Sequence, residues 1–222
     1  MVLWRRLSVI AALSWLVVGC ASPPKPSNST VPAATTPTPG DPSKGRVVVL
    51  FFSDLHGQLR PGPDGLGGYA RIATKIREEK SRADANTDVV VILGGDAAGK
   101  SALPCRKTKE KECFALLADM GIDFAVLGNG ELKRPATELS ELLKISKVNW
   151  LSANVSAQNR EWTGYRVFTG PKSGADWTIT GWPIPPTPGE LEPRKAGYTV
   201  RETPSPSDWQ EWNSRPATLF LS

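Results

Sequence analysis

The stretch that decides the fold runs from residue 46 to residue 57 and reads RVVVLFFSDLHG. Its first half, Val47 to Phe52, is a continuous apolar, β-branched and aromatic run, which is typical of a strand buried on both faces of a parallel sheet. Its second half turns polar at once and places Asp54 and His56 one residue apart. Because ligands of open α/β sheets bind beyond the carboxyl ends of the strands, this stretch predicts a buried strand followed by part of a site.

The same alternation continues along the chain. Further buried strands are predicted at 89–93, 124–127 and 148–152. Helices between them are indicated by apolar residues at helical spacing: Tyr69, Ile72, Ala73 and Ile76, then Phe114, Leu116, Leu117 and Met120, then Leu139, Leu142 and Leu143. Strands that alternate with helices predict an α/β layered domain, a sheet with flanking helices. Residues 177–180 and 217–221 are candidates for two more strands, and the Pro- and Trp-rich stretch between them carries no assignment.

Composition limits the chemistry and the partners. The 222 residues contain one histidine, three cysteines, and 27 Lys+Arg against 22 Asp+Glu, which gives a formal charge of +5. Two of these charges are Arg5 and Arg6, so removal of residues 1–19 leaves +3 (5 − 2). Such a small surplus argues against nucleic acid as a partner. The single histidine, His56, excludes any mechanism that needs a histidine cluster.

The N-terminus predicts export. Arg5 and Arg6 precede an apolar segment, Leu7 to Val18, that is too short to span a bilayer comfortably and fits a signal peptide over residues 1–19. The following Cys20 and the small residues before it resemble a bacterial lipobox. That resemblance implies acylation of Cys20 and anchoring in a bacterial membrane, with the outer membrane favoured, facing the periplasm or the cell surface. A plain secretory signal with an incidental cysteine is the alternative.

The segment after Cys20 predicts a tether. Residues 21–45 contain seven prolines with Ser and Thr and almost no large apolar residue. Such a composition cannot bury enough surface to fold, and it tends to an extended spacer. We therefore expect three parts: a signal peptide (1–19), an acylated cysteine with its tether (20–45), and a folded domain (46–222).

Polar residues follow three successive predicted strands. Asp54 and His56 come after the first strand, Asp96 follows two glycines after the second, and Asn129 lies after the third. Carboxylate, imidazole and amide ligands suit divalent ions such as Mn, Zn or Fe. Each motif alone is more often a turn or a surface pair. Their occurrence at three successive strand ends predicts a divalent-metal site.

These motifs resemble those of the N-terminal metallophosphatase domain of the bacterial 5′-nucleotidase / 2′,3′-cyclic phosphodiesterase family, within the calcineurin-like metallophosphoesterases. The matching segments are Asp54-Leu55-His56-Gly57, Gly67-Gly68-Tyr69-Ala70-Arg71, Gly95-Asp96-Ala97-Ala98-Gly99-Lys100-Ser101, Gly128-Asn129-Gly130-Glu131 and Ser152-Ala153-Asn154. The resemblance covers residues 46–155, and residues 156–222 diverge. It implies two-metal hydrolysis of nucleotides or related phosphoesters, with Asp54 and His56 on one ion, Asp96 bridging, and Asn129 on the second.

Departures from the family pattern predict that this activity is lost or strongly impaired. Gly130 stands where the family has a histidine that contacts the phosphate, and loss of one preorganised donor costs about 10²–10³ in rate. The chain stops at Ser222, one residue before the family's next metal-binding histidine, so we expect a fold incomplete at the C-terminus and a divalent-metal site that is at most partly retained. Glu131 is a candidate replacement ligand.

Three functions remain open from the sequence. They are an active lipid-anchored phosphoesterase, a non-catalytic surface binding or scaffold lipoprotein, and a truncated fragment of a longer nucleotidase.

The remaining cysteines and the tryptophans have structural interpretations. Cys105 and Cys113 flank a charged segment, RKTKEKE, and predict a disulfide in an oxidising compartment, with free thiols as the alternative. The lysines of that segment predict a solvated loop face. Five tryptophans are expected in the core rather than on a ligand-stacking surface: Trp162, Trp177, Trp182, Trp209 and Trp212.

Overall fold

The computed structural model describes residues 45–97, 99–158, 162–183, 197–214 and 218–221. The predicted signal peptide, Cys20 and most of the tether lie outside these residues, so they stay predictions. Among the helices of the described part, none is both long and apolar enough to cross a membrane.

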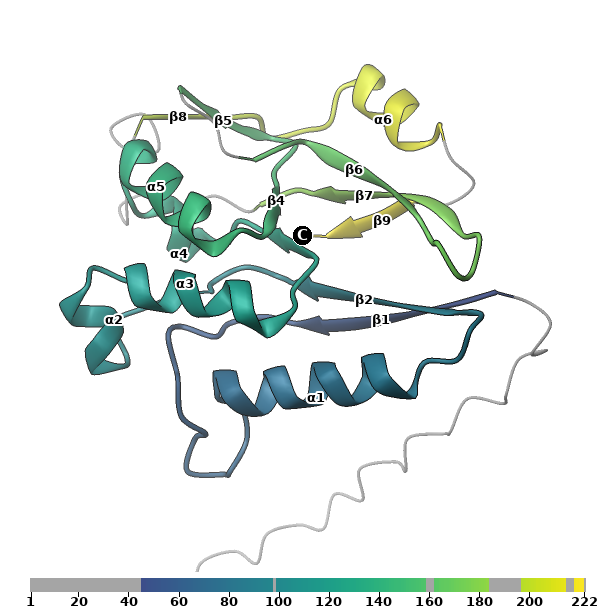
Figure 1. Cartoon of the computed structure of the whole chain (residues 1–222). Helices are drawn as coiled ribbons and strands as arrows, with labels where there is room; N and C mark the ends of the chain where they lie inside the picture. Colours follow the sequence, from purple (N-terminus) through teal and green to yellow (C-terminus); the bar gives the residue numbers. More distant parts are fainter. Residues whose placement is uncertain (1–44, 98, 159–161, 184–196, 215–217, 222) are drawn as a thin grey trace, which may run out of the picture. The chain divides into compact units, whose positions relative to one another are not determined.

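Four parallel strands form the main sheet, in the order β1 (Arg46–Phe52), β2 (Thr87–Leu93), β3 (Phe124–Val126) and β4 (Asn149–Leu151). Helices α1 (Tyr69–Arg82), α3 (Lys111–Met120) and α5 (Ala136–Ser146) pack on one face of this sheet (Figure 1). Their buried apolar stripes meet alternate strand residues such as Val91, Leu93 and Trp150. The α/β fold class predicted from periodicity is confirmed.

A second sheet packs on the other face. It contains β6 (Tyr165–Thr169), β7 (Asp176–Gly181) and β9 (Thr218–Leu221), with β6 antiparallel and β9 parallel to β7. Trp177 and Ile179 of β7 pack against Ile92 and Val126 of the main sheet. The two strands expected at 177–180 and 217–221 are thus confirmed, and they form a layer that the periodicity alone did not predict.

Shorter elements complete the described part. They are α2 (Leu103–Lys107), α4 (Asn129–Leu132), the antiparallel pair β5 (Val155–Ala157) and β8 (Tyr198–Val200), and α6 (Pro206–Trp212). Helix α6 lies in the stretch without a sequence assignment. Its start is fixed by a capping box, in which the Ser205 hydroxyl accepts from the Asp208 N–H and the Asp208 carboxylate accepts from the Ser205 N–H.

Three predictions about burial need correction. Strand β1 is not buried on both faces: it lies at the edge of its sheet, and Val49 and Phe51 are 41% and 58% exposed. The segment RKTKEKE is only partly a solvated loop face: its three lysines are exposed as predicted, but α2 and α3 take up its ends and Glu110 is buried. Trp209 is half exposed, whereas the other four tryptophans of the predicted core are buried.

Candidate metal site

The loops after β1 and β2 run side by side beyond the ends of their strands. The N–H groups of Asp54 and His56 donate to the carbonyls of Gly95 and Asp96 at 3.1 and 2.9 Å. These bonds hold Asp54, His56 and Asp96 in the left-handed region, with φ of 59°, 45° and 49°. A non-glycine residue in that region costs about 1–2 kcal/mol. Strain of this kind clusters at functional sites, where the surrounding structure has to maintain it.

The three side chains converge. One ligand atom from each of Asp54, His56 and Asp96 lies within 4.8 Å of the other two. Nε2 of His56 is 3.4 Å from Oδ1 of Asp54, and both side chains are more than half exposed. Two carboxylates and an imidazole form a donor set that suits a divalent ion such as Mn or Zn. The geometry therefore fits a partial metal site open to solvent.

Asp96 is also held by the loop after β3. The backbone N–H of Gly130 donates to Oδ1 of Asp96 at 2.6 Å. A Cβ atom on Gly130 would clash with the same oxygen. A carboxylate has about four lone-pair sites, so this bond leaves Asp96 able to bind an ion as well. Asn129 is exposed at the first position of α4, and its role as a ligand stays a prediction.

Glu131 is not available as a replacement ligand, which corrects the interpretation from sequence. Its side chain is fully buried and accepts three backbone N–H groups, those of Asp96 (2.8 Å), Ala97 (2.9 Å) and Gly128 (2.8 Å). Burial raises the pKa of this carboxyl, against the opposing charge of Arg134. The carboxylate thus ties the loop after β2 to the loop after β3. Glu131 lies three residues after Gly128 and accepts from its N–H, as the glutamate of a capping box does, but glycine has no side chain for the reciprocal bond.

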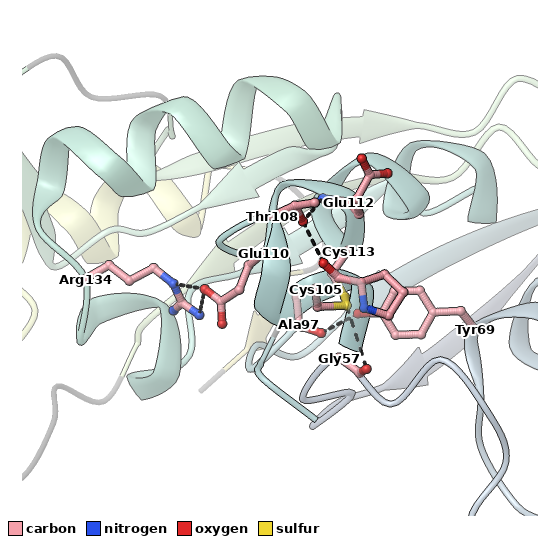
Figure 2. The surroundings of a disulfide bond; sticks show 10 residues. Gly57, Tyr69, Ala97, Cys105, Thr108, Glu110, Glu112, Cys113 and Arg134 are labelled. Carbon is pink, nitrogen blue, oxygen red and sulfur yellow. Dashed lines mark hydrogen bonds and ion pairs between the residues drawn. A yellow bond between two sulfur atoms is a disulfide. The ribbon is translucent and has the colours of Figure 1, made fainter. Parts of the chain in front are cut away.

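A disulfide lies directly behind these loops (Figure 2). Cys105 of α2 and Cys113 of α3 are joined, with their Cα atoms 5.4 Å apart. Sγ of Cys105 is 3.9 Å from the carbonyl oxygen of Gly57, the residue after His56. The hydroxyl of Tyr69 donates to the carbonyl of Ala97 at 2.6 Å. Burial raises the pKa of that hydroxyl, and the charge of Glu131 adds to the effect.

Two residues behind the site had no functional assignment from sequence. Glu110 and Arg134 form a buried ion pair, with side chains 5% and 13% exposed. Arg134 also donates to the carbonyl oxygen of Gly130. Glu110 and Arg134 lie 24 residues apart along the chain, which explains why local sequence patterns did not indicate the pair.

Fold and site together define a phosphoesterase-like domain with a candidate partial metal site. Residues 47–220 match the family model of calcineurin-like phosphoesterases, and the chain belongs to that family. The match extends past residue 155, where the sequence motifs end.

Two curated relatives and one solved structure are similar to the chain. The chain is 28% identical over 153 residues to the uncharacterized protein in the pqq-V 5′ region of Acinetobacter calcoaceticus, covering 62% of this chain and 70% of that protein. It is 28% identical over 171 residues to the snake venom 5′-nucleotidase of Gloydius brevicauda, covering 71% of this chain and 26% of that enzyme. The NAD nucleotidase of Haemophilus influenzae has the same fold over 78% of this chain and 33% of its own length, with a TM-score of 0.62 and 19% identity.

Proposed function

We propose that this calcineurin-like phosphoesterase binds one divalent ion through Asp54, His56 and Asp96, binds a phosphoester such as a nucleotide beside it, and hydrolyses that ligand at a strongly reduced rate. The observation that carries the proposal is the convergence of three donor side chains within 4.8 Å, next to a glycine at position 130. Nucleotidases among the similar proteins support the choice of ligand class.

The family implies a divalent metal, and the donor atoms of Asp54, His56 and Asp96 are suited to one such ion. A divalent ion held there would supply the positive charge that binds and polarises a phosphoester. The exposed side chains of Asp54 and His56 leave the site accessible to a bulky ligand. Asp96 is held by Gly130 and by its backbone bond to Glu131, so its carboxylate is positioned before any ion binds.

Reduced hydrolysis follows from position 130. A phosphoryl transition state needs preorganised donors aimed at its developing charge, and loss of one costs about 10²–10³ in rate. Gly130 has no side chain to provide such a donor, and its N–H is engaged by Asp96. Position 130 thus contributes to the placement of Asp96 rather than to contact with the ligand.

Export and lipid anchoring through Cys20 belong to the same proposal. The supporting features are Arg5 and Arg6, the apolar segment 7–18 and the small residues before Cys20. Labelled palmitate fed to a bacterial host that expresses the chain is expected to appear in the wild type and not in Cys20→Ala. Equal labelling of both proteins, or none in the wild type, would refute the anchor.

The functional test combines binding and turnover. The purified chain with Mn²⁺ is titrated with AMP and assayed on 4-nitrophenyl phosphate, beside His56→Ala and the control Asp119→Asn, an exposed carboxylate on α3. We expect metal-dependent AMP binding in the wild type and the control but not in His56→Ala, with turnover at least about a hundredfold below the usual enzyme value of about 10 s⁻¹. Turnover near that value, abolished in His56→Ala, would show an active enzyme. Absence of AMP binding in the wild type would refute the proposal that the site binds a nucleotide.

A further inference from the structure

We infer that Glu110 and Arg134, held by the Cys105–Cys113 disulfide, are positioning residues for the candidate metal site, because they fix the residue that holds Asp96. The inference deepens the proposed function and relies on it only for the metal ion. Its structural part concerns a series of contacts that begins at the disulfide, Glu110 and Arg134 (Figure 2) and continues through Gly130 to the Asp96 carboxylate.

The chain of contacts starts at the disulfide. Glu110 lies between the two cysteines, where its N–H donates to the Cys105 carbonyl at 2.6 Å and its carbonyl accepts from Phe114 at 3.1 Å. Its φ of 69° is left-handed, an unfavourable conformation for glutamate. The disulfide closes this short segment, so it restrains the backbone that would otherwise relax. The Glu110 side chain is thereby directed inward, towards Arg134.

Arg134 makes the second link. Its Nε donates to Oε2 of Glu110, its Nη2 forms an ion pair with the same oxygen, and its Nη1 donates to the carbonyl oxygen of Gly130. Its own carbonyl accepts from the Tyr198 hydroxyl at 2.8 Å, which fixes the backbone from the opposite side. A guanidinium holds several acceptors in a fixed planar geometry, so Glu110 sets the direction from which Arg134 reaches Gly130.

Gly130 makes the third link. Its carbonyl is bound by Arg134 and its N–H is bound by Oδ1 of Asp96, so two charged side chains hold one small residue from two sides. The disulfide also reaches the other half of the site directly, through the contact of Cys105 with the carbonyl of Gly57 beside His56. The Cys105–Cys113 disulfide therefore contacts the loop that carries His56 and, through Glu110 and Arg134, supports Gly130, which holds Asp96.

A purely structural role for the ion pair makes a different prediction. If Glu110 and Arg134 only stabilise the fold, removing the guanidinium weakens the whole domain and leaves the hydrogen bond from the Gly130 N–H to Asp96 unchanged. If they position the site, the Gly130 amide changes locally while distant amides do not. The amide resonance of Gly130 separates the two roles, since its proton chemical shift reports the hydrogen bond to Asp96.

The experiment uses the isotope-labelled full chain without metal. Arg134→Met keeps an unbranched apolar side chain and removes the guanidinium; Arg201→Met does the same at the Arg201–Asp208 pair and is the matched control. In Arg134→Met we expect an upfield shift of the Gly130 amide proton and hydrogen exchange faster by about tenfold or more. In Arg201→Met we expect neither. Glu110→Gln, which has nearly the same shape, replaces Arg134→Met should the latter not fold.

A Mn²⁺ titration adds the functional arm. Residues that orient metal ligands typically contribute about 10–100-fold to metal affinity, so Arg134→Met should bind Mn²⁺ at least about tenfold more weakly than the wild type and Arg201→Met. An unchanged Gly130 amide, equal changes in both variants, or equal Mn²⁺ affinity of all three proteins would overturn the inference. A wild type that binds no Mn²⁺ would refute the proposed function, and the amide measurement would still decide the positioning role.

Discussion

The backbone N–H of Gly130 donates to Oδ1 of Asp96 at 2.6 Å, and the same oxygen fills the space in which a side chain at position 130 would begin. The absence of a side chain at position 130 and the placement of the Asp96 carboxylate therefore depend on each other. A histidine at position 130 and this position of the Asp96 carboxylate are mutually exclusive, because the Cβ atom itself clashes. The carboxylate would have to move before such a histidine could be accommodated.

This relationship predicts the effect of Gly130→Ala. Alanine in a helix is ordinarily favoured over glycine by about 1 kcal/mol, and Gly130 is not among the glycines with positive φ. We nevertheless expect destabilisation by about 1–2 kcal/mol in urea unfolding, because the methyl group displaces Asp96. In an Asp96→Ala background the same substitution should be neutral or stabilising. A stabilising Gly130→Ala with Asp96 present would contradict the clash.

Glu131 should matter for stability whether or not metal is present. Glu131→Gln replaces one acceptor oxygen with an NH₂ group that faces backbone donors of Asp96, Ala97 or Gly128. A buried donor left without a partner costs about 1–3 kcal/mol. We expect a loss in that range by urea unfolding, unchanged by chelator, and about zero for the exposed control Glu141→Gln. A Glu131→Gln protein as stable as the control would rule out the stabilising role of the Glu131 hydrogen bonds.

The disulfide should contribute measurably to stability. It closes a segment with a sequence separation of 8, for which about 2–3 kcal/mol is expected. The double variant Cys105→Ala/Cys113→Ala should lose at least that amount, because both side chains are also fully buried. Thermal unfolding with and without reductant checks this: the wild type should lose stability on reduction and the variant should not change. A wild type insensitive to full reduction would disprove the contribution.

Asp208 predicts a specific pH dependence. The guanidinium of Arg201 lowers the pKa of this carboxyl, against the opposing effect of burial, and bonds from Ser205 lower it further. Because the pKa is lower in the folded state than the value of about 3.9 when unfolded, the stabilisation is complete above that value and is lost as the pH falls towards the folded-state pKa. Asp208→Asn should be less stable by about 1 kcal/mol at pH 7, with a gap that narrows below about pH 4. A difference in stability between the two proteins that stays constant with pH would contradict the stabilising role of the Asp208–Arg201 ion pair.

Much of the fold and part of the site could be predicted from sequence, for physical reasons. A continuous apolar run predicts β2, because both faces of that strand are buried, and apolar residues at helical spacing predict α1, because one face of that helix is buried. The rule that parallel strands end at one edge predicts that Asp54, His56 and Asp96 meet. Periodicity could not show that Phe51 is exposed, because an apolar run does not reveal what covers it. The burial of Glu110 was missed because its ion-pair partner, Arg134, lies 24 residues further along the chain.

Two further features were not predicted from sequence, for different reasons. Glu131 joins two loops by accepting their backbone N–H groups. The loop that contains Asp96 and Ala97 is more than thirty residues away from Glu131 in the sequence. Helix α6 carries a readable signal, Ser205-Pro206 followed by Asp208, but its tryptophans and prolines obscure any helical period.

The most direct test of the metal site is a calorimetric Mn²⁺ titration of the purified chain beside Asp54→Asn, His56→Ala, Asp96→Asn and the control Asp119→Asn. We expect one ion per chain in the wild type and the control, and affinity reduced at least about tenfold by each of the three site substitutions, since each removes a carboxylate charge or the imidazole from a cluster within 4.8 Å. A wild type that binds no Mn²⁺, or three site variants that bind it as tightly as the control, would contradict the assignment.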